Sequence, residues 1–178
     1  MVGEGCRAEP FAEHHRAALR AACAEDPNIW AMYGTSYDPG HFDASLDALV
    51  TNPLNRLFML FDADEFVGMS AYLNLLDARQ TLEIGNTYYR PRLRGAGLNR
   101  RVKAMMLERA FACGYRRVLF CVDRRNARSQ AAMRKIGAVR EGVLRADRIT
   151  WTGHVRDTVL FAILKDEWPI AGPVAPDR

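Results

Sequence analysis

Apolar positions along the chain change their spacing twice. Up to about residue 50 they recur at helical intervals, as in the alanine-rich stretch from Pro10 to Ala24. From Arg56 to Tyr89 they form short apolar runs separated by polar turns, which predicts an antiparallel meander. After Pro91 helical and strand-like segments alternate. The expected elements are helices over 10–24 and 43–50, strands over 56–61, 66–75 and 80–89, a helix over 98–113, a strand over 117–122, a helix over 126–136, and strands over 138–145 and 155–164.

This order predicts an α/β (α+β) fold with a mixed central sheet. A helix separates the strands 80–89 and 117–122, so we expect these two strands to be parallel. Short turns join the strands of the meander and the two closing strands, and these strands are expected to be antiparallel. The pattern favours a sheet of about six to seven strands with helices on both faces. We expect one domain over residues 1–168 and a loose tail over 169–178.

Composition narrows the class of protein. The chain has 178 residues and 49% hydrophobic residues, which is typical of a globular domain. No apolar run approaches the roughly 18 residues of a membrane-spanning helix, and the N-terminus does not resemble a signal peptide. The four cysteines show neither paired nor metal-ligand spacing. We therefore expect a cytoplasmic protein with reduced thiols, no membrane association and no metal.

Charge is distributed unevenly. Residues 1–50 carry three Lys/Arg against eight Asp/Glu, a balance of −5, whereas residues 90–148 carry seventeen against four, a balance of +13. A basic half is compatible with a nucleic acid, with a small polyanionic ligand, or with a solvated surface. No motif of aromatic residues for stacking RNA bases accompanies it, so nucleic acid is the less favoured partner.

The stretch R-L-R-G-A-G-L, from Arg92 to Leu98, favours a small polyanion. It ends a strand and begins a helix, where backbone N–H groups and the helix dipole attract negative charge. Gly95 and Gly97 leave room for a close approach, and Arg92 and Arg94 add full charges. Neither a P-loop nor a dinucleotide-binding glycine pattern is present. The stretch predicts a pyrophosphate site, although a tight turn alone would also explain two glycines.

Two motifs in this setting resemble those of the GNAT superfamily of acyl-CoA-dependent N-acyltransferases. Arg92, Gly95 and Gly97 match its phosphate signature Q/R-x-x-G-x-G/A, and the segment from Asn126 to Gly137 matches a second signature after the next strand, with Ala138 in place of the usual aromatic residue. The resemblance runs from about Glu9 to Trp168. L-E-I-G, N-A-R-S, E-G-V-L-R and the late G-H-V-R-D further resemble the branch of ribosomal-protein N-terminal acetyltransferases.

The resemblance implies a GNAT fold and acetyl-CoA as co-substrate. It implies direct attack by a primary amine, on a protein N-terminus or a small molecule, in a ternary complex without a covalent enzyme intermediate. It leaves a homodimer open. The residues that it assigns to coenzyme A are Tyr88, Tyr89, Arg92, Arg94, Gly95, Ala96, Gly97, Leu98, Asn99, Asn126 and Ser129.

Two residues are candidates for catalysis. Glu83 alternates with Leu82 and Ile84 on its strand, so it faces away from them and is a candidate general base; a structural pair with Arg79 or another arginine is the alternative. Many family members place a tyrosine acid where this chain has Met133. Ser129 is the expected hydrogen-bond donor to the departing sulfur, unless it only begins a helix.

The acceptor site is expected between the early helices and the last hairpin. Trp30, Tyr33 and Tyr37 lie in the expected lid, and His154 lies in the hairpin with Arg156 and Asp157 close by. Two other functions stay open. One is a catalytically weak, regulatory coenzyme A-binding module, which the replacement at Met133 favours. The other is an RNA- or ribosome-binding protein, which the basic half favours.

Overall fold

The meander predicted between residues 56 and 89 forms the centre of the sheet. In the computed structural model, which describes residues 1–95 and 97–168, strands β3 (Arg56–Asp62), β4 (Glu65–Leu76) and β5 (Thr81–Tyr89) pair in antiparallel order. Strand β6 (Arg117–Asp123) lies parallel to β5, as expected. The hairpin of β7 (Val139–Ile149) and β8 (Val155–Leu164) closes the sheet, with β8 against β6.

The described residues form an eight-stranded sheet in the order β1-β2-β3-β4-β5-β6-β8-β7. The mixed α/β fold is confirmed, and the sheet exceeds the expected size because the first residues add β1 (Val2–Gly3) and β2 (Cys6–Pro10). The prediction that the first strand begins at Arg56 and that a helix begins at Pro10 was wrong. β2 pairs with β3, about fifty residues away in the chain, so no local pattern announces it.

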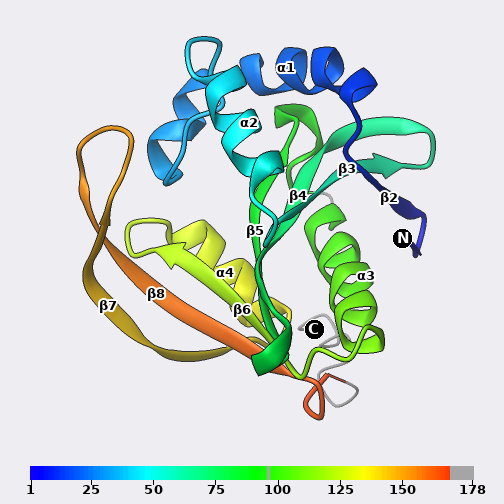
Figure 1. Ribbon diagram of the computed structural model, residues 1–178, viewed down its shortest axis with the longest axis vertical. Coiled ribbons are helices and arrows are strands. Elements are labelled where there is room, and N and C mark those ends of the chain that lie inside the picture. Colours follow the sequence, from blue (N-terminus) through cyan, green and yellow to red (C-terminus); the bar gives the residue numbers. More distant parts are fainter. Residues whose placement is uncertain (96, 169–178) are drawn as a thin grey trace.

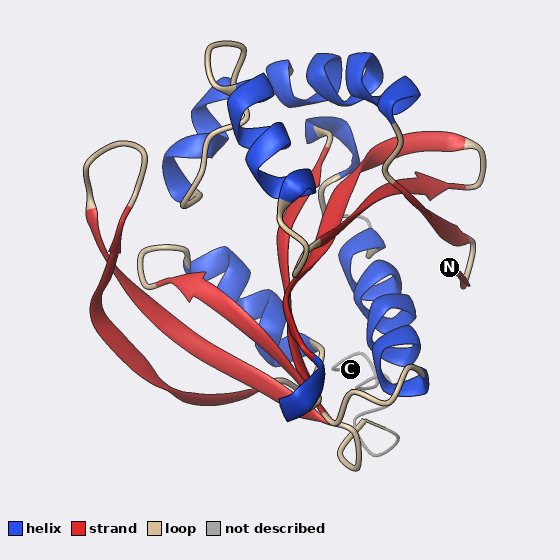
Figure 2. Cartoon of the chain, viewed as in Figure 1, coloured by secondary structure: helices blue, strands red, loops and turns tan. Residues whose placement is uncertain are grey.

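Helices cover both faces of the sheet (Figures 1 and 2). One face carries α1 (Arg16–Ala24) and α2 (Phe42–Thr51), and the other carries α3 (Leu98–Ala112) and α4 (Ala127–Lys135). Short 3₁₀ turns lie at Glu13–His15, Pro27–Met32, Asp77–Arg79 and Pro91–Leu93.

Two apolar cores separated by the sheet hold these layers together. The core on the α3 side includes Leu82, Ile84 and Phe120, and the core on the α1–α2 side includes Trp30 and Tyr88. Alternate residues of β3 serve different cores: Leu57 and Met59 belong to the α1–α2 side, whereas Leu60 belongs to the α3 side. The predicted tail at 169–178 lies outside the described residues.

Candidate active site

The glycine turn before α3 has the geometry of an anion site. Gly97 is the N-cap residue of α3 and has a φ of 77°, and Gly95 has a φ of 95°, so both adopt conformations that favour glycine. A Cβ built at either position meets no atom within 4 Å. The first N–H groups of a helix have no intrahelical acceptor, so those of Leu98 and Asn99 are available to an anion above this open turn. Ala96 lies outside the described residues.

The two arginines of the turn are bonded to carboxylates. Arg94 donates from Nη1 to Asp26 at 2.5 Å and from Nε to the carbonyl of Tyr89 at 2.9 Å. Arg92 forms an ion pair with Glu65 and keeps a side chain that is 55% exposed. Carboxylates thus engage both guanidinium groups, while the buried Nη2 of Arg94 has no hydrogen-bond partner among the described residues.

Strands β5 and β6 separate beside this turn. Their parallel pairing covers only Thr81 to Glu83 on β5 and Arg117 to Leu119 on β6. Figure 1 shows the two strands side by side at one end and apart at the other. Beyond Glu83, the described part of β5 has no strand partner on its β6 side. Its backbone groups there are free to bond an extended arm, as in strand addition.

A bulge lies in β5 where the strands separate. The register between β4 and β5 shifts around Ser70, and Asn86 has a φ of 46°, in the left-handed region. A bulge turns the backbone groups of its strand out of the regular ladder. It therefore changes which groups of β5 point toward the opening.

Two of the lid residues predicted to contact the acceptor, Tyr33 and Tyr37, form hydrogen bonds to this bulge. The hydroxyl of Tyr33 donates to the carbonyl of Thr87 at 2.6 Å, and the side-chain amide of Asn86 donates to the hydroxyl of Tyr37 at 3.0 Å. Trp30 is fully buried, with its ring stacked on that of Tyr88 at 4.9 Å between centroids. The side chains of Trp30 and Tyr37 leave almost no surface for an acceptor.

Tyr88 and Tyr89 contribute mainly through their main chain. Tyr88 is buried, and its hydroxyl donates to the carbonyl of Ala22 at 2.6 Å. The hydroxyl of Tyr89 donates to the side chain of Asn99 at 3.2 Å, which ties β5 to the first turn of α3. Both phenols are thus anchored, while the backbone of β5 borders the opening.

Glu83 lies at the same opening, on the face opposite α3. Its carboxylate accepts a hydrogen bond from the Asn74 amide at 3.4 Å, and the nearby Cys121 thiol acts to lower its pKa. A Cβ on Gly85 would lie 2.7 Å from Leu73 Cδ1 and 3.2 Å from Oε1 of Glu83, so the glycine makes room for both side chains. No guanidinium of the described residues lies within ion-pair distance of it. Burial raises the pKa of Glu83, which suits a group that accepts protons near neutral pH.

Lys103, which the sequence analysis did not single out, lies under the bulge. Its side chain on α3 is 3% exposed, and Nζ donates to the hydroxyl of Thr87 at 2.5 Å and to that of Ser70 at 3.4 Å. Nζ also lies 6.0 Å from the centre of the Phe120 ring on β6. Burial lowers the pKa of Lys103 to about 7. In the sequence, this residue is a single lysine at a position of the helix where the apolar pattern predicts a buried side chain, and this is the signal that could have identified it.

The second motif begins α4. Asn126 caps the helix, because its Oδ1 accepts the backbone N–H of Ser129 at 2.9 Å. Ser129 lies in the first turn and is partly exposed. Met133, at the position of the usual tyrosine, is 4% exposed and packs in the core on the α3 side. The N-cap of α4 is therefore formed by the Asn126 side chain and does not need the hydroxyl of Ser129.

The β7–β8 hairpin meets the lid. The indole N–H of Trp151 donates to the carbonyl of Trp30 at 2.8 Å, and the Trp151 ring lies 5.2 Å from that of His41. His154 lies in the hairpin turn, where its carbonyl accepts the N–H of Thr150 at 2.9 Å. These contacts join the lid and the hairpin above the face that carries Glu83.

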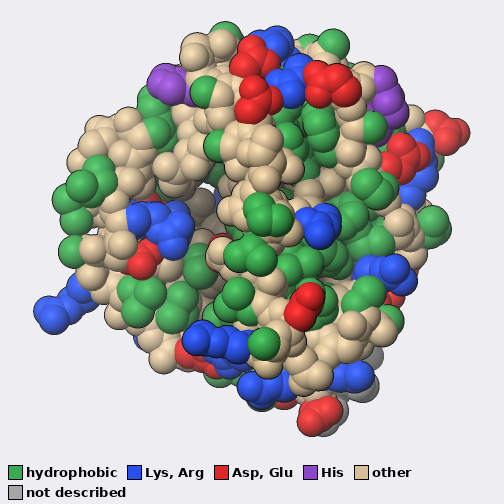
Figure 3. Space-filling model, viewed as in Figure 1, with side chains coloured by type: hydrophobic (Ala, Val, Ile, Leu, Met, Phe, Trp, Pro, Cys, Tyr) green, Lys and Arg blue, Asp and Glu red, His purple; other side chains and the backbone are tan. Residues whose placement is uncertain are grey.

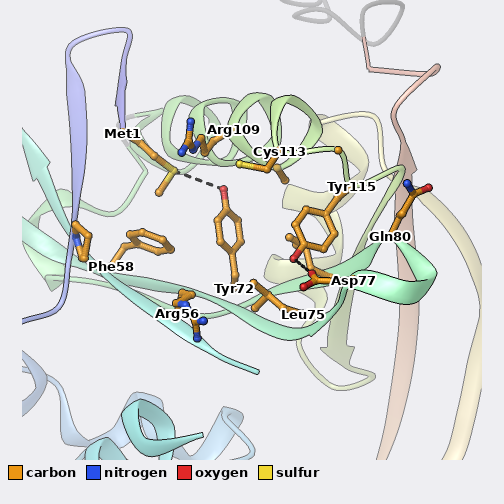
Figure 4. Close-up of a pocket in the computed structure, with 14 residues that line it drawn as sticks. Met1, Arg56, Phe58, Tyr72, Leu75, Asp77, Gln80, Arg109, Cys113 and Tyr115 are labelled. Carbon is orange, nitrogen blue, oxygen red and sulfur yellow. Dashed lines mark hydrogen bonds between the residues drawn. The ribbon is translucent and has the colours of Figure 1, made fainter. Parts of the chain in front are cut away.

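A cavity of about 890 Å³ lies elsewhere, between α3 and the sheet (Figure 4). Tyr72 extends across it from β4 and donates to the carbonyl of Met106, and the hydroxyl of Tyr115 donates to Asp77 at 2.5 Å. None of the predicted site residues lines this cavity. Its walls come from the C-terminal half of α3 and from β3 to β5, away from the glycine turn.

The described residues show neither a membrane-spanning helix nor a cluster of metal-ligating side chains. No helix in residues 1–95 and 97–168 has both the length and the apolar character needed to cross a membrane. Within the same ranges, no group of three or more His, Cys, Asp or Glu side chains gathers as metal ligands.

The sequence profile of the family described as "Acetyltransferase (GNAT) domain" matches residues 7–139. The chain belongs to this family and is an acyl-CoA-dependent acetyltransferase. A GNAT-family protein from Chromobacterium violaceum shares 31% identity with it, over 94% of this chain and 87% of that one, with a TM-score of 0.87. A protein from T. thermophilus described as an acetyltransferase shares 32% identity, over 96% and 91% of the two chains, with a TM-score of 0.85.

More distant structures share the fold. Spermidine N-acetyltransferase from Vibrio cholerae, in complex with CoA and spermine, is 16% identical over 93% of this chain and 98% of that one, with a TM-score of 0.77. Ribosomal-protein-S5-alanine acetyltransferase from Vibrio fischeri is 17% identical over 94% and 99%, with a TM-score of 0.76. No curated protein has significant sequence similarity to the chain.

Proposed function

We propose that the protein transfers an acetyl group from acetyl-CoA to a primary amine, by direct attack within a ternary complex. The observation that carries the proposal is the partly buried carboxylate of Glu83 at the opening between β5 and β6, on the face opposite the glycine turn and α3. A thioester placed in this opening would be reached by coenzyme A from one side and by an amine from the other.

The coenzyme A site is proposed at the glycine turn and along the free side of β5. The N–H groups of Gly97, Leu98 and Asn99 bind the pyrophosphate, and the backbone at Tyr88 and Tyr89 bonds the pantetheine arm and polarises the thioester carbonyl. Arg92 and Arg94 strengthen the positive potential of the turn. Asn126 borders the arm from the start of α4.

Proton movement is assigned to two side chains. The carboxylate of Glu83 accepts a proton from the attacking ammonium group, directly or through a water. The hydroxyl of Ser129 donates a hydrogen bond to the thiolate sulfur that leaves. The core packing of Met133 supports this second assignment, because a thioether cannot donate a proton.

The acceptor is either a small amine or a protein N-terminus. The motifs shared with ribosomal-protein N-terminal acetyltransferases, and the common fold with the Vibrio fischeri enzyme, support membership of that branch. The ion pairs of Arg92 and Arg94 reduce the basic surface open to RNA, which favours the small polyanion over a nucleic acid.

Coenzyme A binding and thiol release test the proposal. Gly97→Glu places a carboxylate above the anion site and strains a residue with positive φ, so we expect coenzyme A binding to weaken at least about tenfold by calorimetry, a loss of about 1.4 kcal/mol. Gly114→Glu is the matched control, since Gly114 also has a positive φ, of 94°, and open space at its Cβ.

A panel of amines and N-terminal peptides then reports acetyl transfer as thiol release from acetyl-CoA. Equal coenzyme A affinity in the wild type and in Gly97→Glu would overturn the site assignment. Tight coenzyme A binding without thiol release on any amine would favour the regulatory coenzyme A-binding module instead.

A further inference from the structure

Arg156 is a buried cation without a carboxylate partner in the described structure. It lies on β8, is 5% exposed, and donates from Nη2 to the carbonyl of Cys121 at 3.0 Å. Its Nε is buried and has no hydrogen-bond partner. On the lid side, a Cβ built at Gly34 would lie 3.6 Å from Nη1. Burying a charge without a counter-ion is costly, so a group that completes the site is expected.

The neighbouring carboxylates are already engaged. Asp123 accepts the guanidinium of Arg125 at 2.9 Å, and Asp147 accepts that of Arg148 at 2.7 Å. Both lie near enough to influence Arg156, but neither is within 4 Å of it. Among the described residues, Arg156 therefore has no carboxylate at ion-pair distance.

Arg156 shares its compartment with Glu83. Cys121 lies beside both, because its carbonyl accepts a hydrogen bond from Arg156 and its thiol acts on the pKa of Glu83. Arg148 lies directly opposite Arg156 in the β7–β8 pair, and both guanidinium groups act on the charge of Glu83. Figure 3 shows a hollow between the β7–β8 arm and the rest of the molecule, with Lys or Arg side chains gathered on the arm beside it.

We propose that Arg156, assisted by Arg148, binds a carboxylate of the acceptor, so that the acceptor is an amine that also carries an acid group, as free amino acids do. The inference rests on the proposed function for its amine end, which reacts beside Glu83. A guanidinium group suits a planar carboxylate, because it donates along a matching edge. The same two cations repel a polyamine, so spermidine is expected to be a poor acceptor.

Matched acceptors test the inference in the wild-type protein. Alanine, leucine and phenylalanine are each compared with their carboxamide and with the decarboxylated amine, and spermidine is included, all by thiol release from acetyl-CoA. We expect kcat/KM to be at least about tenfold higher for the acids than for the carboxamides, the scale of one charge-assisted hydrogen bond. Equal values for acids and carboxamides would overturn the inference without any variant.

Variants locate the effect. Arg156→Gln is expected to bring the ratio of acid to carboxamide close to one while the KM for acetyl-CoA stays unchanged. Arg156→Lys retains the charge without the two-pronged edge and gives an intermediate ratio, which protects the test if the glutamine variant does not fold. Arg140→Gln, at an exposed position of β7, should leave the ratio as it is. A full preference for acids in Arg156→Gln would contradict the assignment.

Failure of the proposed function would look different. If no amine is acetylated, binding of the three amino acids to the coenzyme A-bound protein is measured by calorimetry. This measurement tests the anion site at Arg156 without acetyl transfer. Saturable binding that Arg156→Gln weakens supports the anion site although acetyl transfer has failed. Absence of binding for all three amino acids overturns the inference.

Discussion

At the scale of single residues, Glu83 has the environment of a general base. Replacing it by glutamine keeps the size of the side chain and removes the proton acceptor, so we expect kcat to fall by about 10²- to 10⁴-fold. In the wild type, kcat/KM should increase with pH through the pKa of Glu83, which burial raises above its ordinary value. pH profiles of kcat and of kcat/KM, for the variant and the wild type, measure both effects.

A measurement of the stability of Glu83→Gln distinguishes a loss of catalysis from a loss of folding. A buried carboxyl with a raised pKa favours the folded state only when it is protonated, and this contribution is lost as the pH rises through the folded pKa. Glu83→Gln should therefore have a urea midpoint at pH 7.5 at least equal to that of the wild type. Glu141→Gln, which removes a carboxylate paired with Arg117, is the control expected to keep its activity. An unchanged kcat in Glu83→Gln would remove it from the mechanism.

The pKa of Lys103 is shifted in the opposite direction to that of Glu83, because burial favours the neutral amine. Its folded pKa is about 7 against an ordinary 10.5, so the unfolded chain binds a proton between these values that the folded chain does not. Stability linked to this group is complete above about pH 10.5 and is lost as the pH falls through 7. We expect Lys103→Met to unfold at a higher urea concentration than the wild type at pH 6, with the difference closing toward pH 10.

The hydroxyls that Lys103 contacts still bond one another in this variant, at 2.7 Å between Ser70 and Thr87, so no orphan is created. Lys135→Met, at an exposed position of α4, should show no such pH dependence. A Lys103→Met protein that is less stable at every pH would show that the ammonium form is the structural one.

At the scale of elements, the bulge in β5 depends on the lid. Tyr33→Phe removes the hydrogen bond to the carbonyl of Thr87, which should cost about 1 kcal/mol of stability and also reduce kcat. Tyr115→Phe removes a hydrogen bond of similar length to Asp77, away from the opening, and should affect stability alone. Urea titration and steady-state rates on both variants separate the effect on stability from the effect on kcat. If Tyr33→Phe and Tyr115→Phe have the same kcat, the bulge does not position groups for catalysis.

The start of α4 tests whether Asn126 only caps the helix. Asn126→Ala should cost about 1 kcal/mol, the usual loss of an N-cap. Asn126→Asp keeps an acceptor for the N–H of Ser129 and should retain that stability, but it loses the amide donor and adds a negative charge beside the proposed pantetheine path. A raised KM for acetyl-CoA in Asn126→Asp would show the second role, and an unchanged KM would leave Asn126 as a cap.

The elements that the sequence predicted well are those with local causes. The helix at Leu98 and the strand at Arg117 follow apolar spacing and a glycine boundary, and both appear within a few residues of their predicted limits. Strand β2 has small residues such as Cys6 and Ala8 at its buried positions, and its partner is distant in sequence. The bulge at Asn86 and the burial of Lys103 also depend on contacts between elements, which no periodicity records.

At the scale of the whole molecule, the uneven charge along the sequence becomes a set of ion pairs in space. Basic residues from the second half bond acidic residues from other elements, such as Arg94 to Asp26 and Arg101 to Asp62. The predicted excess of positive charge in residues 90–148 is therefore partly neutralised by the acidic first half. Sequence could indicate the imbalance, but only the fold shows which charges lack an ion-pair partner among the described residues, as Arg156 does.

These pairs predict how the molecule responds to acid. The Ser36 hydroxyl and then His41 lower the pKa of Asp38 to about 2, the Arg101 guanidinium lowers that of Asp62, and the Arg117 guanidinium lowers that of Glu141. A carboxylate with a lowered folded pKa contributes stability that is complete above its unfolded pKa and is lost as the pH falls through the folded value. We therefore expect the urea midpoint to fall between pH 4.5 and 2.5.

Because exposed ion pairs are screened by salt, part of this dependence should weaken in 0.5 M NaCl. Arg101→Gln, which leaves Asp62 without its partner, should start from a lower midpoint at pH 7 and lose less on acidification. The three carboxylates lie in the lid, at the end of β3 and on β7, so the loss should be spread over the molecule and keep one cooperative transition. A urea midpoint that stays constant between pH 4.5 and 2.5 would show that these pairs do not contribute to folding.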